Sequence, residues 1–150
     1  MDQARGKGDT DTSPPGRPRL RLVLADDHHS VREELGALLD REFDRIRTVG
    51  DGRALLEACA QLHPDVVVTD IQMPLLGGIE AGRQILQEGY CGSVILLSLH
   101  LDETIVRAAM SGGIRGYILK LDAGEELLNA VRVVAAGGTY LSAGVRARLS

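Results

Sequence analysis

The sequence predicts an α/β fold, a doubly wound parallel sheet of five strands that alternate with five helices. Five short apolar runs and five segments of helical periodicity follow one another in strict alternation over residues 20–136. The run at 65–69 is continuous and β-branched, which is typical of a parallel strand covered on both faces. Strands separated by helices pair in parallel through right-handed crossovers, which gives this fold class.

The first half of the chain supplies three of the strands. The first is expected at 20–25, and Ser30 with Glu33 forms a capping box that predicts the start of the helix after it. A weaker strand at 45–49 leads into a helix over 52–62, which His63-Pro64 ends. The continuous run at 65–69 is the third strand.

The second half repeats the pattern. The loop 73–78 opens a helix that continues to about Glu88, where Gly89 ends it, and the fourth strand follows at 94–97. Asp102 is expected to start the next helix, which Gly112-Gly113 stops. After a fifth strand at 116–119, Asp122 with Glu125 predicts the start of the last helix, and Gly137-Gly138 ends it.

Length and composition narrow the class of protein. A chain of 150 residues is expected to form one domain. Cys59 and Cys91 lie in or beside apolar helical patterns, and their spacing is not that of a zinc site, so we expect both to be buried core residues. The sequence contains no apolar run of 18 residues and no signal-peptide core, so we expect a cytoplasmic protein without a membrane segment. A net charge of -4 and 3% aromatic residues argue against nucleic-acid binding by this chain alone.

The two ends of the chain differ from its centre. Residues 1–19 are rich in Gly, Pro, Asp and Arg and almost free of large apolar side chains, so we expect a disordered extension. Residues 20–136 form the predicted domain. Residues 137–150 are expected to begin a linker to an output domain that this chain does not contain.

Charged and polar side chains end four of the predicted strands. Asp26-Asp27 follows the first strand, Asp70 the third and Ser98 the fourth. Lys120, the one lysine beyond the first 19 residues, closes the fifth. If these strands are neighbours, all of these side chains converge at the carboxyl edge of the sheet, where ligands of open α/β sheets bind.

This set of side chains favours phosphoryl chemistry. Three carboxylates in one cleft repel each other and need a cation, and their oxygens suit Mg²⁺. Asp70, on the central strand, is the candidate nucleophile, because a carboxylate can attack phosphorus to form an aspartyl phosphate. Lys120 and Ser98 are placed to contact phosphoryl oxygens.

The order of these motifs resembles the receiver domain of bacterial two-component response regulators. The resemblance covers about residues 20–136. Its elements are the pair Asp26-Asp27, DIQMPLLGG from Asp70 to Gly78, Ser98 in LLSLH, and GYILK from Gly116 to Lys120.

Some positions depart from the commonest pattern: Ser98 replaces a Thr, Leu99 a small Ala, and Leu121 a Pro. The last two, with the tail Gly137–Ser142, resemble the branch whose receivers precede a LuxR-type helix-turn-helix.

The resemblance implies a fold, roles and partners. It implies a flavodoxin-like sheet with strand order 2-1-3-4-5 and a phosphoryl group accepted on Asp70 from a sensor histidine kinase. Mg²⁺ would be bound by Asp26, Asp27, Asp70 and the backbone carbonyl of Gln72. Ser98 and Tyr117 would form a switch pair that changes the face built from residues 101–136. Transcription would be regulated, and DNA bound, through an output domain outside this chain, with a homodimer forming on phosphorylation.

Other functions remain open. A receiver that serves only as a docking module, without phosphorylation, is one alternative. A haloacid-dehalogenase-type phosphatase is another. Such enzymes carry the sequence motif DxD, however, and Gln72 takes the place of the second Asp here. We therefore expect a signalling module that takes part in phosphoryl transfer, and its own dephosphorylation, without being an enzyme. His28 and His29, next to the acidic pair, are expected to be exposed loop residues.

Overall fold

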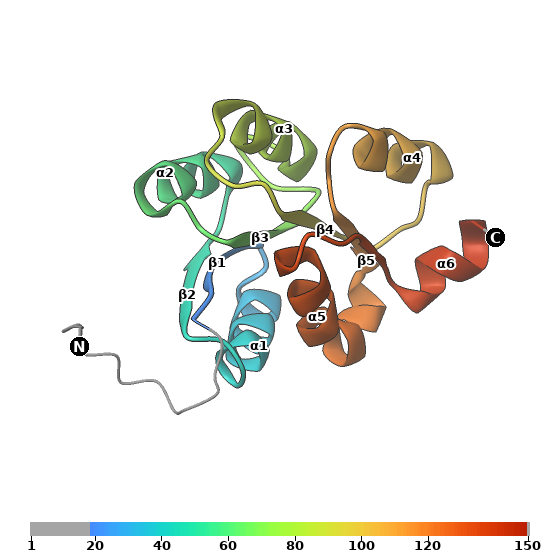
Figure 1. Ribbon diagram of the computed structural model, residues 1–150, viewed down its shortest axis with the longest axis horizontal. Helices are drawn as coiled ribbons and strands as arrows, with labels where there is room; N and C mark the ends of the chain where they lie inside the picture. Colours follow the sequence, from blue (N-terminus) through green and yellow to red (C-terminus); the bar gives the residue numbers. More distant parts are fainter. Residues whose placement is uncertain (1–18, 150) are drawn as a thin grey trace.

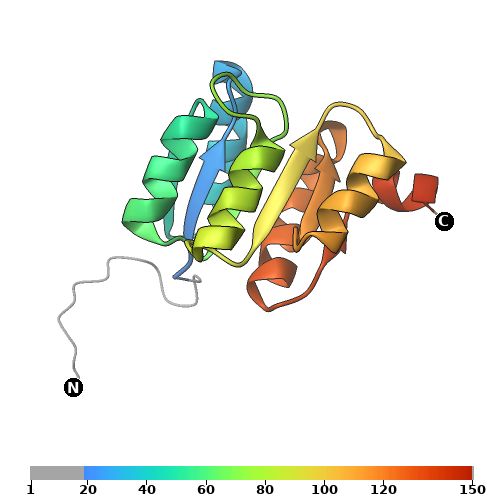
Figure 2. The same cartoon turned by 90° about the horizontal axis from the view of Figure 1, so that it is seen from above.

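The computed structural model describes residues 19–149 and shows a parallel sheet with helices on both faces (Figure 1). The strands lie in the order β2-β1-β3-β4-β5-β6, and all pairs are parallel. In Figure 2 the arrows of β1 and β4 point the same way. The strands are β1 (Arg21–Ala25), β2 (Arg45–Val49), β3 (Val66–Asp70), β4 (Val94–Ser98), β5 (Gly116–Leu119) and β6 (Tyr140–Leu141).

The helices form two layers around this sheet. In Figure 1, α1 and α5 cover one face, and α2, α3 and α4 cover the other. The helices are α1 (His29–Asp40), α2 (Gly52–Leu62), α3 (Gly78–Glu88), α4 (Glu103–Ser111), α5 (Lys120–Ala135) and α6 (Ala143–Leu149). Within residues 19–149, none of these helices has the length and apolar character that a membrane crossing needs.

Apolar side chains fill the space between the sheet and each helical layer. Every residue of β3 is buried, as the continuous run predicted. Because side chains of a strand alternate, Val67 joins the cluster under α2 and α3, while Val66 and Val68 join the cluster under α1 and α5. Cys59 and Cys91 are free and buried, and burial raises the pKa of the Cys59 thiol to about 12. Both act as core residues, as expected.

Several predicted helix ends are confirmed. Asp51 caps α2, since its side chain accepts a hydrogen bond from the Ala54 amide at 2.8 Å. The helix ends at His63, whose φ of 45° is left-handed. Asp102 caps α4 by accepting from two backbone amides, and Gly89 ends α3 in the left-handed conformation.

Two predicted capping boxes are wrong. Helix α1 starts at His29, with His28 as its N-cap and no side-chain cap, so Ser30 lies inside the first turn. Helix α5 starts at Lys120, directly after β5, because the chain turns into the helix without a loop. The Asp122 carboxylate instead accepts hydrogen bonds from Ser142 and Gly144, far along the chain.

The expectation of five strands and five helices is also wrong by one of each. Within residues 19–149 the sheet gains β6, which pairs with β5, and α6 follows it. Both lie in the 137–150 segment that was expected to begin a linker, and they cover the β5 edge of the 101–136 face. The disorder expected for residues 1–19 falls, except for Arg19, outside the described residues.

Candidate functional site

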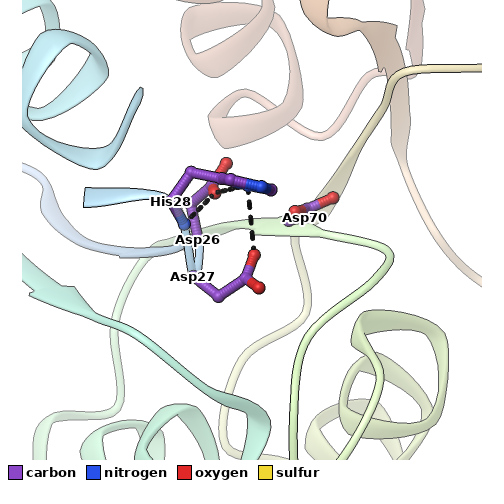
Figure 3. Close-up of side chains that lie close together, drawn as sticks. All are labelled: Asp26, Asp27, His28 and Asp70. Carbon is purple, nitrogen blue, oxygen red and sulfur yellow. Dashed lines mark hydrogen bonds and ion pairs between the residues drawn. The ribbon is translucent and has the colours of Figure 1, made fainter. Parts of the chain in front are cut away.

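The parallel register brings the predicted strand ends together at the carboxyl edge of the sheet. β1 and β3 are neighbours, with Ala25 opposite Thr69, so the acidic pair after β1 lies beside Asp70. Figure 3 shows Asp26, Asp27, His28 and Asp70 grouped at this edge. The ligand atoms of these four residues all lie within 4.8 Å of one another.

Lys120 reaches this group from the start of α5. Its Nζ lies 2.9 Å from Asp26 Oδ2 and 3.0 Å from Asp70 Oδ2. The side chain of Lys120 is 9% exposed, so these contacts are only weakly screened. Burial lowers the pKa of Lys120, but the two carboxylates raise it by more, and the ammonium stays charged at neutral pH.

The negative charge of the buried carboxylates is not fully balanced by nearby positive charge. Burial raises the pKa of Asp70 above its ordinary value, the contact with Lys120 lowers it, and the Asp26 charge raises it again. Asp26 is fully buried, and its Oδ2 accepts no hydrogen bond, only the ion pair with Lys120. Three carboxylates thus face one ammonium.

These observations fit a divalent cation. A bound cation would offset the excess negative charge and give the Asp26 Oδ2 atom, which has no hydrogen-bond partner, a second charged partner beside Lys120. Asp26, Asp27 and Asp70 provide the carboxylate oxygens that Mg²⁺ prefers. A ligand role for the Gln72 carbonyl stays a prediction, while the Gln72 amide donates to Asp70 Oδ1 at 3.3 Å.

His28 is an exposed loop residue, as the sequence predicted, but it also contacts the acidic pair. Its side chain is 60% exposed, but its Nδ1 points at the acidic pair, 3.4 Å from Asp26 Oδ1 and 3.3 Å from Asp27 Oδ1. The backbone amide of His28 also donates to Asp26 Oδ1, at 2.9 Å, which turns the residue inward. The adjacent acidic pair was the available signal. His29, in contrast, faces outward toward Glu33 on α1.

Ser98 and Tyr117 line the same small pocket beside Asp70, which has a volume of about 240 Å³. The Ser98 hydroxyl donates to the His100 carbonyl at 2.5 Å, so it is engaged with its own loop. Tyr117 is 1% exposed, and burial raises the pKa of its phenol. In this structure the predicted switch residues are therefore neighbours, with the tyrosine turned inward.

Gly78 is a site residue whose importance sequence reasoning missed. A Cβ atom at this position would lie 1.9 Å from the backbone carbonyl oxygen of Asp70. The Gly78 amide also donates to the Ile71 carbonyl at 2.8 Å, which closes the loop 71–77 back onto β3. Only glycine permits this approach. The Gly77-Gly78 pair in the motif was the available signal.

Comparison with known proteins identifies a family model and two curated relatives that this chain resembles. The family model of the response regulator receiver domain matches residues 22–132. The transcriptional regulatory protein DegU of Brevibacillus brevis is 36% identical over 125 residues, which make up 82% of this chain and 53% of DegU. The transcriptional regulatory protein MctR of Rhizobium johnstonii is 39% identical over 132 residues, or 86% of this chain and 61% of MctR.

The similarity extends to solved structures. A two-component response regulator of the LuxR family from Aurantimonas sp. SI85-9A1 superposes with a TM-score of 0.79 at 28% identity, covering 89% of this chain and 100% of that one. The chain spans between 53% and 61% of the length of the two curated relatives. Both of those relatives are named transcriptional regulators.

Proposed function

The chain belongs to the response regulator receiver domain family, and we propose on that premise that Asp70 accepts a phosphoryl group from a sensor histidine kinase. The observation that carries this proposal is the bridge from Lys120 Nζ to both Asp70 and Asp26, at 3.0 and 2.9 Å. It supports a site in which a buried carboxylate and a compact cation meet at a pocket. We place the protein in the cytoplasm, where such a kinase domain would reach it.

The proposed reaction moves one phosphoryl group. An oxygen of Asp70 forms a bond to phosphorus as the bond from phosphorus to the donor imidazole nitrogen breaks, and that nitrogen keeps the electron pair. Burial raises the pKa of Asp70, and the Lys120 ammonium opposes this shift by favouring the carboxylate, which is the nucleophilic form. Lys120 then stabilises a phosphoryl oxygen and keeps Asp26 as its second partner.

Asp26, Asp27, Asp70 and the Gln72 carbonyl are the proposed ligands of Mg²⁺. When bound, the ion would neutralise the charge that develops on the equatorial phosphoryl oxygens. Two backbone amides orient the carboxylates: the Gln72 amide donates to Asp70 Oδ1, and the His28 amide donates to Asp26 Oδ1.

Ser98 and Tyr117 are the proposed switch pair. The Ser98 hydroxyl would exchange its bond to the His100 carbonyl for one to a phosphoryl oxygen. Both residues line the pocket next to Asp70, so movement of the hydroxyl changes the space open to the Tyr117 ring. The change would spread over the face of α4, β5 and α5, to which β6 and α6 are attached.

The partner that delivers the phosphoryl group must bring its donor imidazole to Asp70, whose Oδ2 lies 3.0 Å from Lys120 Nζ. An open groove of about 680 Å³ lies between α1 and α5 and is lined by Lys120. Leu99 and Leu121 also line it, and they are 62% and 83% exposed. We assign this groove to the kinase. Formation of a homodimer on phosphorylation stays a prediction, tested by light scattering with and without beryllofluoride.

The output of the whole protein is proposed from its relatives, which are transcriptional regulators. DNA binding would belong to an output domain beyond these residues. The 150 residues carry a net charge of -4, and after α5 only Arg146 and Arg148 are basic, too few cations to hold duplex DNA. Fluorescence anisotropy at physiological salt should show no saturable binding, and micromolar or tighter binding would contradict this assignment.

A second candidate, a receiver that docks partners without phosphorylation, has no observation in its favour, because the acidic group and Lys120 are together. A dehalogenase-type phosphatase would need an acid or base two residues after the nucleophile, where Gln72 lies. The experiment that tests the main proposal is incubation with acetyl phosphate and Mg²⁺, followed by intact mass measurement.

The wild-type protein should gain the mass of one phosphoryl group in a reaction that requires a divalent ion. Asp70→Asn should abolish the gain, and Asp40→Asn, at an exposed position of α1, should leave it intact. A gain that survives in Asp70→Asn, or that persists in the presence of a chelator, would overturn the proposal.

A further inference from the structure

The segment β6–α6 is bound to the strand that leads into Lys120. The Tyr140 amide donates to the Arg115 carbonyl at 2.8 Å, and the Ser142 amide donates to the Tyr117 carbonyl at 3.1 Å. These bonds place β6 along the edge of β5. Ser142, which follows β6, is fully buried although it is polar.

The Ser142 hydroxyl connects the two sides of Lys120. It accepts a hydrogen bond from the Leu119 amide at 3.1 Å and donates one to Asp122 Oδ2 at 2.7 Å. Leu119 precedes Lys120, and Asp122 lies two residues after it. A single buried hydroxyl thus holds the backbone before the lysine and a side chain of the helical turn that contains it.

The start of α6 packs against the same junction. The Gly144 amide donates to Asp122 Oδ2 at 3.0 Å. A Cβ atom on Gly144 would lie 2.6 Å from Leu119 Cδ1 and 3.0 Å from Asp122 Oδ2, so the two segments are in close contact. Because α5 begins at Lys120 with no loop after β5, a displacement at Leu119 passes directly to the lysine.

We propose that Ser142 is a positioning residue for Lys120, and that it couples the place of α6 to the phosphorylation site. The inference rests on the proposed function for the role of Lys120, but the coupling itself is a property of the fold. Lys120 reaches Asp26 and Asp70 from a backbone position that Ser142 holds. Since coupling is reciprocal, a change in the contacts of Lys120 on phosphorylation would alter the hold on α6. This gives α6 a direct connection to the site.

The same segment offers a matched control. The Tyr140 hydroxyl donates to Glu126 Oε1 at 2.6 Å, so Tyr140→Phe removes one hydrogen bond between β6 and α5. This bond is similar in length to the one from Ser142 to Asp122, but it lies more than one helical turn beyond Lys120. A purely structural role for Ser142 predicts that Ser142→Ala and Tyr140→Phe behave alike.

The composition of the chain makes the test direct. The sequence has two lysines, Lys7 and Lys120, so protein labelled with ¹³C and ¹⁵N only in lysine gives two sets of side-chain signals. The Cε and Hε shifts of Lys120 report its contacts with Asp26 and Asp70. They need no phosphoryl chemistry, so they test the positioning even if the proposed function fails.

Ser142→Ala should move the Lys120 signals toward those of a free lysine and should slow phosphorylation by acetyl phosphate about tenfold, since small misplacements of reacting groups have large effects on rate. Tyr140→Phe should lower the melting temperature but leave the Lys120 signals and the rate unchanged. A folded Ser142→Ala protein with wild-type signals and rate would overturn the inference.

If Ser142→Ala does not fold, Gly144→Ala provides the second variant. It keeps the hydroxyl but presses a methyl group onto Leu119 and Asp122. The inference then requires shifted Lys120 signals in Gly144→Ala, and unchanged signals would contradict it.

Discussion

Two segments bring Asp70 and Lys120 together, and they are built in opposite ways. Asp70 ends β3 and leads into a long loop in which Leu75 has a left-handed φ of 70° and a side chain that is 74% exposed. Lys120 follows β5 without any loop and begins α5. Its neighbours are held by the buried hydroxyl of Ser142.

The difference shows where the fold tolerates strain. The loop 71–77 contains Leu75 in an unfavourable backbone conformation, and it ends at a close approach to Asp70 that only Gly78 allows. At the β5–α5 junction, the Leu119 amide and the Asp122 carboxylate are both hydrogen-bonded to the Ser142 hydroxyl. Under the proposed function, the carboxylate that would accept the phosphoryl group borders the strained loop, while the ammonium lies at the junction that Ser142 holds.

The largest effect should come from changing the geometry of the ammonium. Lys120→Arg keeps the positive charge but replaces a compact head by a larger planar one. We expect a folded protein in which beryllofluoride no longer causes the NMR shift changes near Tyr117 that it causes in the wild type. Arg107→Lys, at an exposed position of α4, is the control. Wild-type switching in Lys120→Arg would mean that any cation suffices.

Gly78→Ala should be the most destabilising of the loop variants. Its methyl group would lie 1.9 Å from the Asp70 carbonyl oxygen, and the obstacle is backbone, which cannot rotate away. We expect a loss of about 3 kcal/mol in the free energy of unfolding, at the upper end of the usual range for overpacking, measured by urea denaturation.

The neighbouring glycine gives a matched control for that experiment. A methyl group on Gly77 would meet mainly the Glu80 side chain, which is able to move. Gly77→Ala should therefore change the free energy of unfolding by less than about 1 kcal/mol. Equal losses in the two variants would show that the tight approach to Asp70 is not the cause.

Asp70→Asn should stabilise the protein at neutral pH. Burial raises the pKa of Asp70, so the native state binds its proton more tightly than the unfolded state does. This proton favours folding at low pH, and the contribution is lost as pH rises from the unfolded pKa, about 3.9, through the native pKa.

The asparagine has no charge to bury. We therefore expect the free energy of unfolding of Asp70→Asn to exceed that of the wild type by about 0.5–2 kcal/mol at pH 7, and this difference should shrink as pH falls toward 4. Denaturation curves across this pH range measure it. A gain that is equally large at pH 4 and pH 7 would contradict the electrostatic cause.

The smallest effect concerns the strained loop residue. Leu75→Gly removes the steric strain of a left-handed φ, although glycine also gives the unfolded chain more freedom. We expect the variant to raise the free energy of unfolding by up to about 1 kcal/mol. Leu76→Gly, one position along, lacks this relief and should destabilise the protein. If both variants are destabilised equally in thermal unfolding, the strain at Leu75 is not significant.

Much of the fold was predictable because its signals are local. The boundaries of β2 and α2 follow from periodicity and from breakers such as His63-Pro64, and Asp102 caps α4 as expected. The capping box at Asp122 failed because its carboxylate accepts hydrogen bonds from Ser142 and Gly144, which are distant in the chain. The one at Ser30 failed because α1 already begins at His29. Strand β6 is too short for a periodic signal, and its hydrogen bonds to Arg115 and Tyr117 form only in the folded protein.

In the site, too, some features follow from the sequence and others depend on contacts that form only in the folded protein. The convergence of Asp26, Asp70 and Lys120 follows from strand order, since residues that end parallel strands meet at one edge. The inward turn of His28 depends on a backbone bond to Asp26 that no pattern of residues specifies. The contact of Gly78 with Asp70, and the bonds of Ser142, likewise depend on how segments distant in the chain meet.

The most direct test of the central claim locates the phosphoryl group itself. Borohydride reduces an aspartyl phosphate to homoserine, so protein treated with acetyl phosphate and Mg²⁺, then with borohydride, can be digested and sequenced by mass spectrometry. We predict homoserine at position 70, and none when the divalent ion is removed. Homoserine at position 26 or 27 instead, or phosphorylated protein with no homoserine, would contradict the assignment of Asp70 as the phosphoacceptor.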